Sequence, residues 1–339
     1  MMNPKLLIAL TEDEKKDFLP PKVLARLDEL PLDIEWLDLP LESVEDWPGI
    51  LAEKKPDALM AAWACPRLPD DLTVGEGGLR YVAYLAGSIR KLVPRELLVN
   101  GLQVTNWGNS ISRTISECGL LLTLSAMRRA SRWSVAMHRD GAWKQGLQTV
   151  TQSLFERRVG IHGFGNIAQQ MVPLLKPFDV SISAFSPSVP DAVFEDLGVA
   201  RSNSLEELFS QNDVIIELAP YHERNHHIVT EKLLRSIPPG GAFVNIGRGA
   251  VVDEAAMIRV AKDRADDLQL ALDVYEKEPL ARDSPLRGLP NVALLPHIAG
   301  PTKDRRCDSS LIAIENLARL ARGEPIGDAI TPEQFDRAT

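Results

Sequence analysis

The sequence predicts an α/β protein with two doubly wound parallel sheets. Its 339 residues are enough for two domains with separate cores. Apolar runs alternate with amphipathic stretches along most of the chain, which is typical of parallel sheets covered by helices on both faces. A glycine-rich turn, Gly163–Ala168, also joins an apolar run to a helical pattern, as at the ligand-binding edge of such a sheet.

The first part of the chain contains the elements of one sheet. Period-2 or continuous apolar patterns predict its strands, which are expected over Lys5–Leu10, Ile34–Leu39, Ala58–Trp63, Leu79–Ala86 and Leu102–Thr105. Helical spacing predicts helices over Lys15–Leu27 and Val44–Glu53.

A second series of elements follows a helix expected over Glu117–Ala130. Its strands are expected over Arg158–His162, Val180–Phe185, Val214–Leu218, Ala242–Ile246, Leu268–Leu272 and Val292–Leu295. Its helices are expected after Gly165, from a capping box at Ser204–Glu207, and over Thr230–Ser236 and Asp253–Asp263. The chain then returns to a helix whose apolar stripe contains Leu311, Ile314 and Leu317.

Composition and charge restrict the class of function. A formal net charge of −9 argues against nucleic acid or an anionic membrane surface as a partner. Three widely separated cysteines, Cys65, Cys118 and Cys307, suggest neither a disulfide framework nor a thiolate metal cluster. The apolar run Leu6–Leu10 is too short for a signal peptide, and Cys118–Met127 is too short to span a membrane. A cytoplasmic protein is expected.

The string Gly163-Phe164-Gly165-Asn166-Ile167-Ala168 matches the dinucleotide fingerprint G-x-G-x-x-G/A. The first glycine permits a tight turn, the second lets a pyrophosphate approach the backbone, and the small last residue packs helix on strand. Glycine turns are common, but this one follows a strand, opens a helix and begins a series of βαβ units. A Rossmann-like domain that binds NAD or NADP is therefore predicted.

The acidic residue that usually holds the adenosine ribose is missing from this fingerprint. The second strand ends at Phe185-Ser186-Pro187-Ser188, while Asp179 precedes it and Asp191 follows the next turn. The choice between NAD and NADP consequently stays open.

Three segments that follow strands carry the residues of a candidate active site. Arg248 stands between Gly247 and Gly249, and its forked guanidinium suits a carboxylate or a polarised carbonyl. An acidic segment after the next strand contains Glu276 and Glu278, either of which could be a surface acid, and His297 lies after the last strand. Arginine, acid and imidazole together predict a site that anchors an anionic carbonyl compound and moves a proton.

Other polar residues have simpler interpretations. His222-Glu223-Arg224-Asn225-His226 spells the H-E-x-x-H metal motif, but no apolar helix surrounds it and no third ligand follows. No metal site is predicted. Cys65, His138 and His162 are interpreted as packing residues. Asp273 ends an apolar strand, where a charge tends to face a ligand or a partner.

These motifs, in this order and over nearly the whole chain, resemble those of the NAD(P)-dependent D-isomer-specific 2-hydroxyacid dehydrogenases. The resemblance implies that Arg248 binds the substrate carboxylate and carbonyl, that His297 is the general acid/base, and that Glu278 orients His297. It also implies that Asp273 tunes this network. Cofactor contacts are then expected at Gly163, Phe164, Gly165, Asn166, Ile167, Ser186, Ala219, Pro220, Ile246, Gly247, Arg248, Asp273, His297 and Gly300.

The resemblance also implies a domain organisation. Residues 1–112 and 300–339 would form the substrate-binding domain, residues 113–299 the NAD(P)-binding domain, and a cleft would separate them. Backbone N–H groups at Gly87 and Ser88 would hold the substrate carboxylate, although Ser88 replaces a usual glycine and Arg90 a frequent aspartate. The apolar Cys118–Met127 run should be covered, and in related enzymes this region pairs two subunits, so a homodimer with Glu117–Phe155 at its interface is expected.

The expected reaction is hydride transfer from NAD(P)H to a small 2-keto acid, giving a D-2-hydroxy acid as in glyoxylate/hydroxypyruvate reductases. His297 would donate a proton to the carbonyl oxygen while Arg248 stabilises the developing charge. The alternative is a dinucleotide-sensing interaction protein of the co-repressor type, which shares the fold and these residues. A zinc hydrolase using His222 and His226 is a more distant alternative.

Overall fold

The computed structural model describes residues 3–144 and 151–337 of the chain. The chain divides into two compact units, which are described separately. Unit 1 comprises Met1–Ile111 and Pro301–Thr339, and unit 2 comprises Ser112–Gly300.

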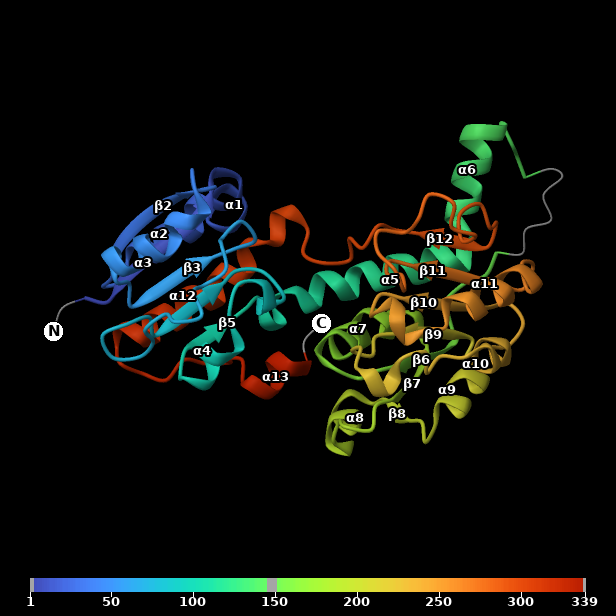
Figure 1. Ribbon diagram of the computed structural model, residues 1–339. Coiled ribbons are helices and arrows are strands. Elements are labelled where there is room, and N and C mark those ends of the chain that lie inside the picture. The colour runs from blue at the N-terminus through green and yellow to red at the C-terminus, as the bar shows by residue number, and fades with distance from the viewer. Residues whose placement is uncertain (1–2, 145–150, 338–339) are drawn as a thin grey trace. The chain divides into compact units, whose positions relative to one another are not determined.

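Unit 1 is built around a five-stranded parallel sheet of order β2-β1-β3-β4-β5 (Figure 1). Its strands are β1 Lys5–Thr11, β2 Asp33–Leu39, β3 Ala58–Ala61, β4 Tyr81–Tyr84 and β5 Gln103–Thr105. Its helices are α1 Glu12–Phe18, α2 Pro21–Asp28, α3 Trp47–Lys54, α4 Arg95–Val99, α12 Cys307–Ala321 and α13 Pro332–Arg337, with 3-10 turns η1 Val44–Asp46, η2 Ile89–Lys91, η3 Gly108–Ile111 and η7 Lys303–Arg305.

Helices cover both faces of this sheet, because successive strand residues point to opposite sides and both sets are apolar. Leu7, Leu59 and Val82 belong to one core cluster, and Leu6, Met60 and Tyr81 belong to the other. The single helix predicted over Lys15–Leu27 is wrong. Pro20 separates α1 from α2, because a proline cannot continue the helix that precedes it.

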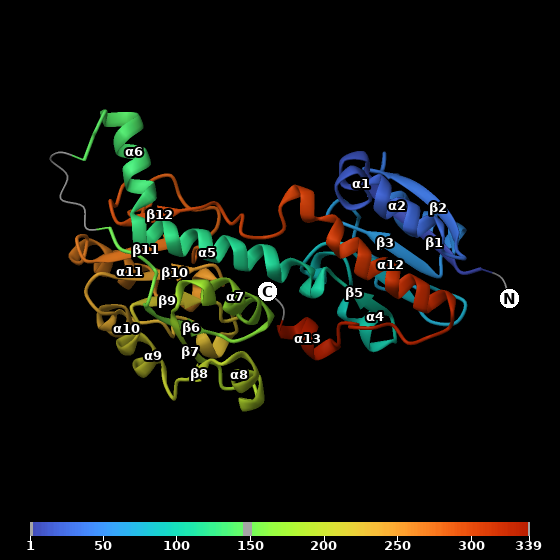
Figure 2. The same ribbon diagram turned by 180° about the vertical axis from the view of Figure 1, so that it is seen from behind.

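Unit 2 contains a seven-stranded parallel sheet of order β12-β11-β10-β9-β6-β7-β8 (Figures 1 and 2). Its strands are β6 Arg158–His162, β7 Ser181–Phe185, β8 Ala200–Arg201, β9 Val214–Glu217, β10 Gly241–Asn245, β11 Leu268–Leu272 and β12 Val292–Leu294. Its helices are α5 Ser112–Arg128, α6 Ala130–Asp140, α7 Asn166–Leu175, α8 Asp191–Leu197, α9 Leu205–Gln211, α10 Glu231–Ser236 and α11 Glu254–Asp263, with 3-10 turns η4 Lys176–Phe178, η5 Glu223–Asn225 and η6 Gly249–Val251.

The strand order reverses at β6, which lies between β7 and β9. This reversal is the topological switch point at which doubly wound sheets bind ligands. The two parallel sheets confirm the predicted α/β fold class. The capping box expected at Ser204 is only half formed: Ser204 accepts from the Glu207 N–H at 3.1 Å, but the Glu207 carboxylate accepts from the Asn203 N–H at 2.8 Å instead.

Helix α6 was not predicted, and in both ribbon views it stands away from the rest of unit 2 (Figures 1 and 2). Every residue of α6 keeps some solvent exposure, and Val135 and Met137 are exposed apolar side chains on it. Helix α6 thus has no buried face within the described part of this chain.

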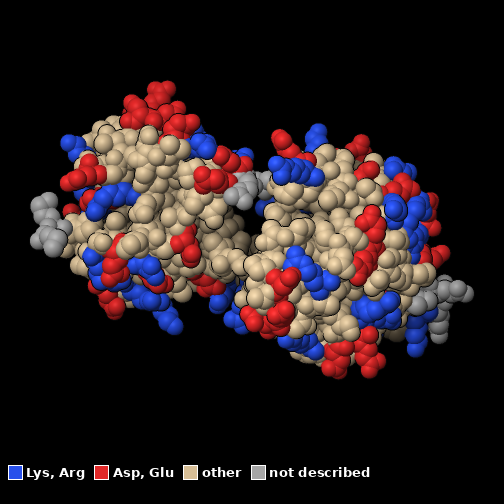
Figure 3. Space-filling view, turned by 90° about the horizontal axis from the view of Figure 1, so that it is seen from below, with Lys and Arg blue, Asp and Glu red and all other residues tan. Residues whose placement is uncertain are grey.

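Charged side chains of both signs are mixed on the face shown in Figure 3. Among the described residues on this face, Lys and Arg lie between Asp and Glu and do not form one wide basic surface. The face therefore lacks the basic footprint of a nucleic-acid-binding protein.

Candidate active site

The turn after β6 has the geometry that a dinucleotide phosphate requires. Gly163 has φ +84°, and a Cβ there would lie 2.6 Å from the Ala219 nitrogen, so only glycine fits. Gly165 is the N-cap of α7, and a Cβ at Gly165 would meet nothing within 4 Å. A ligand can thus approach the backbone at the start of α7, where amide groups favour an anion.

The other residues expected around this turn differ in what they can offer. Asn166 and Pro220 are exposed, and Ile167 and Gly300 are partly buried. The side chains of Phe164, Ala219 and Ile246 are buried, so these three can offer a cofactor mainly their backbone. The Phe164 ring packs 4.6 Å from the Phe194 ring, centroid to centroid.

Ser186, at the end of β7, has an arginine beside it that sequence reasoning missed. Arg201 of β8 donates from Nη2 to the Ser186 carbonyl oxygen at 3.1 Å and from Nη1 to Asp191 at 2.7 Å. Its guanidinium also lies over the Phe194 ring, 4.7 Å from the centroid. An arginine near the end of the second strand is the usual means of accepting a 2′-phosphate. The segment 186–190 contains no arginine, but the fold brings Arg201 beside Ser186.

The loop after β10 carries Arg248 and is fixed by hydrogen bonds with the Asn245 side chain. The Asn245 side chain accepts from the Gly247 N–H at 3.1 Å and donates to the Arg248 carbonyl oxygen at 3.3 Å. A Cβ at Gly249 would lie only 1.8 Å from the Tyr275 carbonyl carbon. Gly249 therefore lets this loop lie directly against the segment that leads to Glu278.

Arg248 is exposed as a residue, yet its guanidinium is partly shielded by the surrounding protein. This desolvation lowers the pKa of Arg248, and the nearby charge of Glu278 acts in the opposite direction. Arg248 also donates from Nη1 to the Gly247 carbonyl oxygen at 2.8 Å. The loop thus presents a cation that has already lost part of its water shell, close to the acid of the site.

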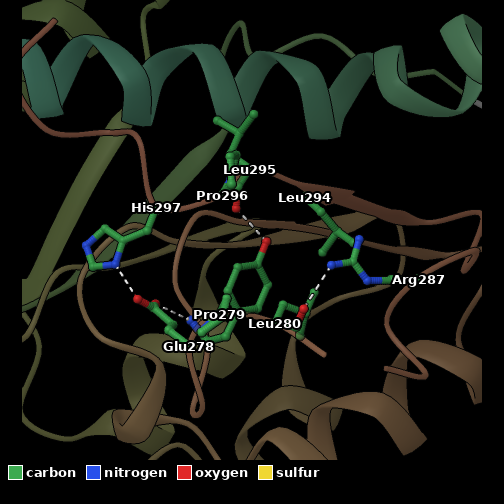
Figure 4. A pocket seen from close by; sticks show the side chains of 9 residues that line it. Glu278, Pro279, Leu280, Arg287, Leu294, Leu295, Pro296 and His297 are labelled. Carbon is green, nitrogen blue, oxygen red and sulfur yellow. Dashed lines mark hydrogen bonds and ion pairs between the residues drawn. The ribbon is translucent and has the colours of Figure 1, made fainter. Parts of the chain in front are cut away.

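His297 and Glu278 form a direct pair (Figure 4). His297 Nδ1 lies 2.6 Å from Glu278 Oε2, and the two side chains are 48% and 34% exposed. The other oxygen, Glu278 Oε1, accepts from the Tyr275 N–H at 3.0 Å, which fixes the carboxylate. The pair borders a pocket of about 520 Å³ whose wall is otherwise mainly apolar, including Pro279, Leu280 and Pro296.

Two buried groups shape the loop that carries His297. His297 has φ +56°, a left-handed conformation that is costly for a residue with a side chain. The fully buried Asp273 carboxylate accepts from the N–H groups of Ile298 and Ala299, both at 2.8 Å. Burial, with the charge of Asp273, raises the pKa of Tyr275 to about 12, and its hydroxyl donates to the Leu295 carbonyl oxygen at 2.6 Å. Asp273 thus holds the turn after His297, and its expected position facing a ligand or a partner stays a prediction.

Comparison with protein families identifies the chain. Residues 120–299 match the model of the D-isomer specific 2-hydroxyacid dehydrogenase NAD binding domain. The chain belongs to this family. It is an NAD(P)-dependent oxidoreductase, and the resemblance seen in the sequence is confirmed.

Named relatives and solved structures agree with this assignment. The chain is 30% identical over 264 residues to a glyoxylate reductase of Korarchaeum cryptofilum, covering 76% of this chain and 78% of that protein. It is 31% identical over 228 residues to a hydroxyphenylpyruvate reductase of Plectranthus scutellarioides, covering 67% and 70%. The NAD-complexed D-isomer specific 2-hydroxyacid dehydrogenase of Lactobacillus delbrueckii ssp. bulgaricus has the same fold, with a TM-score of 0.77, 16% identity, and coverage of 96% of this chain and 100% of that one. Within the described residues, no helix is both long and apolar enough to cross a membrane.

The predicted substrate loop belongs to unit 1, whereas Arg248, Glu278 and His297 belong to unit 2. Gly87 packs so closely on Trp107 that a Cβ there would lie 2.5 Å from the indole ring, and its carbonyl oxygen accepts from Asn106 Nδ2 at 2.8 Å. Ser88 is exposed and is the N-cap residue of η2. Arg90 donates from Nη2 to the Phe335 and Asp336 carbonyl oxygens at 3.1 and 2.7 Å. The guanidinium of Arg90 thus binds the C-terminal segment.

The H-E-x-x-H string does not adopt the geometry of a zinc peptidase site. His222 is the N-cap of η5, and His226 follows that short turn, so the two imidazoles do not lie one α-helical turn apart. A different trio, His226, His227 and Glu276, has ligand atoms within 4.8 Å of one another. His227 Nε2 already lies 2.9 Å from Glu276 Oε1, which explains this proximity without an ion.

The packing roles predicted for three residues have different outcomes. Cys65 is buried in the core of unit 1, as predicted. His138 is exposed on α6, so its predicted packing role is wrong within this chain. His162 is buried, but it is paired with Glu217, a residue that the sequence did not single out. The two residues are separated by 55 positions, and no local pattern links them.

Proposed function

We propose that this dehydrogenase reduces small 2-keto acids to D-2-hydroxy acids, with His297 as the general acid, Glu278 as its orienting carboxylate and Arg248 as the substrate-binding cation. The observation that carries this proposal is the 2.6 Å contact between His297 Nδ1 and Glu278 Oε2. With Nδ1 directed at the carboxylate, proton transfer to the substrate would use Nε2, on the other side of the ring.

Each residue has a defined task in the proposed reaction. The bound nicotinamide supplies the hydride. Protonated His297 donates a proton to the substrate carbonyl oxygen, and Glu278 keeps the imidazole in the required orientation. Arg248 binds the substrate carboxylate and stabilises the negative charge that develops on the oxygen. Backbone N–H groups at Gly87 and Ser88 would add donors for the carboxylate.

The names of most of these relatives support a small substrate, whereas the hydroxyphenylpyruvate reductase is named for a larger one. Matches include glyoxylate reductases of archaea and a glyoxylate/hydroxypyruvate reductase B of Pectobacterium carotovorum, which is 30% identical over 226 residues. We therefore expect glyoxylate and hydroxypyruvate to be better substrates than bulky 2-keto acids. A screen of glyoxylate, hydroxypyruvate, pyruvate and larger 2-keto acids with NADH and NADPH would test this order. NADH binding without turnover of any of them would favour a dinucleotide sensor of the co-repressor type.

His297→Ala tests the catalytic assignment. Loss of the general acid should lower kcat by about a hundredfold or more, because general acid catalysis commonly contributes that much. The dissociation constant for NADH should change little. Arg248→Lys should also lower turnover severely, since an ammonium group cannot reproduce the forked hydrogen bonds of the guanidinium. His222→Ala is the matched control, and near-normal turnover by His297→Ala would remove His297 from the mechanism.

Both nicotinamide cofactors are proposed to be used. Ser186 lacks the charge that would repel a 2′-phosphate, and Arg201, next to it, would attract one. Asp191 already pairs with Arg201, which limits the gain for NADPH. Steady-state kinetics with each cofactor would measure the preference.

A cytoplasmic homodimer that needs no metal completes the proposal. Leu121, Val135, Met137, Trp143 and Phe155 are apolar side chains exposed along the predicted interface, whose residues 145–150 lie outside the described part of the chain. Such a surface favours burial against a second copy. Sedimentation should give twice the chain mass at micromolar concentration, and a monomer would contradict the dimer.

The proposed reaction needs no metal. Activity should survive prolonged chelation, since neither histidine of the H-E-x-x-H string is given a catalytic task.

A further inference from the structure

Four strands of unit 2 end in a row of side chains beneath the dinucleotide turn. Phe185 of β7 is the register partner of His162 of β6, His162 is the partner of Glu217 of β9, and Glu217 is the partner of Asn245 of β10. Register partners in a parallel sheet present their side chains on the same face. The row therefore crosses the switch point at the carboxyl edge of the sheet.

The two central residues of this row form a buried ion pair. His162 Nδ1 lies 2.6 Å from Glu217 Oε2, and the side chains are 7% and 0% exposed. The other oxygen, Glu217 Oε1, accepts from the Ala219 N–H at 2.8 Å. A buried carboxylate is costly unless it is paired and hydrogen-bonded, so the position of Ala219 depends on the same group that pairs with His162.

The pair lies where two cofactor loops meet. His162 is followed directly by Gly163, and the Gly163 turn rests against the Ala219 backbone. The Leu218 N–H also donates to the His162 carbonyl oxygen at 2.8 Å. A change in the pair is thus transmitted to both the phosphate-binding turn and the Ala219-Pro220 segment.

We propose that His162 and Glu217 are positioning residues for the cofactor and that protonation of His162 makes NAD(P)H affinity depend on pH. With both groups ionised, the pair is neutral and holds the two loops. Without the imidazole proton, the uncompensated Glu217 charge stays beneath a turn that has to bind an anionic pyrophosphate. Repulsion then weakens binding, because charges interact strongly in a site of low polarity.

Glu217 dominates the electrostatic surroundings of His162. Burial alone would lower the pKa of His162, but the charge and hydrogen bond of Glu217 outweigh it, so this pKa is raised above 6.5. Helix α9 packs on β6 and carries two acids, but Glu206 lies near Lys232 and Glu207 accepts from Asn203. The flanking row members, Phe185 and Asn245, carry no charge.

The direction of the pH effect follows from this raised pKa. The pair contributes fully at a pH below the ordinary imidazole value, and the contribution is lost as the pH rises through the pKa of folded His162. NADH should therefore bind more weakly in alkaline solution. The dissociation constant should rise by up to about tenfold if binding shifts the titration of His162 by one pH unit.

The test is the dissociation constant of NADH, measured by fluorescence titration between about pH 6 and 10 on the full chain. Glu217→Gln keeps the shape of the side chain and an oxygen for the Ala219 N–H but removes the charge. Its affinity for NADH should vary little with pH and should exceed that of the wild type at the alkaline end. If the pair had a purely structural role, Glu217→Gln would lower the melting temperature, but the pH profiles of NADH affinity for the variant and the wild type would not cross.

A second His–Glu pair provides the control. His227 and Glu276 are 2.9 Å apart and 34% and 37% exposed, so Glu276→Gln should keep the pH profile of the wild type. A flat wild-type profile would overturn the proposal without any variant, and so would a Glu217→Gln profile that runs parallel to the wild type. The measurement concerns cofactor binding alone, so it is independent of the proposed keto-acid reaction.

Discussion

In unit 2 the loops after the strands are held by buried polar side chains. In unit 1 the buried Ser309 hydroxyl donates to the Leu85 carbonyl oxygen directly after β4, but the Gly87–Arg90 part of that loop is held largely by side chains nearer the surface. Asp273 and Glu217 have no exposed surface and Asn245 has 1%. Glu217 and Asn245 each bind backbone groups of the loop that follows, and Asp273 binds backbone groups of the loop after β12. Around Gly87, by contrast, the holding groups are the partly buried Asn106 and the exposed Arg90.

The difference determines how costly a change in each loop is. An unpaired buried donor or acceptor costs about 1–3 kcal/mol, whereas an exposed ion pair contributes about 0–1 kcal/mol. The loops of unit 2 that carry the proposed cofactor and proton-transfer residues are therefore fixed in advance. The proposed substrate loop of unit 1 can vary at small cost, and its Ser88 and Arg90 already depart from the usual pattern of the family.

Among the substitutions that test this contrast between the two units, Asp273→Asn should have the largest effect on stability and activity. An amide offers one acceptor oxygen where the carboxylate serves two N–H groups, so one donor of Ile298 or Ala299 loses its partner. The free energy of unfolding should fall by about 1–3 kcal/mol. kcat should fall more than NADH affinity, because the left-handed turn at His297 loosens.

Urea unfolding and steady-state kinetics would measure both effects. The matched control is Asp283→Asn, at an exposed aspartate of the same unit. If Asp273→Asn left both stability and kcat unchanged, the buried carboxylate would not be what fixes the histidine loop.

The fold and the segments of the proposed active site could be predicted because their signals are local, whereas the choice of Glu278 over Glu276 came from the family resemblance. Alternating apolar runs predict βαβ units, and Arg248, Glu278 and His297 each lie in a short motif after a strand. Asp273 shows the limit of this reasoning. A charge after an apolar strand indicates a special position, but only the fold shows that its partners are the N–H groups of Ile298 and Ala299.

Contacts between distant segments could not be predicted. Arg201 approaches Ser186 because β8, a strand of two residues, pairs with β7. So short a strand has no detectable period. The bonds from Arg90 to the Phe335 and Asp336 carbonyl oxygens span nearly three quarters of the chain, with separations of 245 and 246 positions. Without an alignment, nothing in the sequence marks these residues as neighbours.

Ser186→Asp tests the loop after β7, which departs most from the pattern of support by buried side chains in unit 2. The exposed ion pair between Arg201 and Asp191 supports this loop. A carboxylate at this position can accept from the ribose hydroxyls and repel a 2′-phosphate. The ratio of kcat/KM should shift toward NADH by about 1–3 kcal/mol. Arg201→Gln should shift it the same way by weakening NADPH alone. If the wild type already rejects NADPH by several orders of magnitude, Ser186 does not set the preference.

Arg90→Ala should have the smallest effect, because the Arg90 side chain is bonded at the surface of unit 1. The guanidinium binds two carbonyl oxygens of the C-terminal segment and lies over the Phe335 ring, 5.7 Å from its centroid. Removing the guanidinium should raise KM for the keto acid by a factor of about two to ten, equivalent to roughly 0.5–1.5 kcal/mol. NADH affinity and kcat should stay as in the wild type, since the cofactor turn belongs to unit 2.

The control variant is Arg95→Ala, which breaks the ion pair with Asp336, with bonds of 2.7 Å, and leaves the substrate loop itself intact. If Arg95→Ala raises KM as much as Arg90→Ala, the C-terminal segment as a whole positions the loop. A loss of kcat in Arg90→Ala as large as in Asp273→Asn would contradict the contrast between the two units.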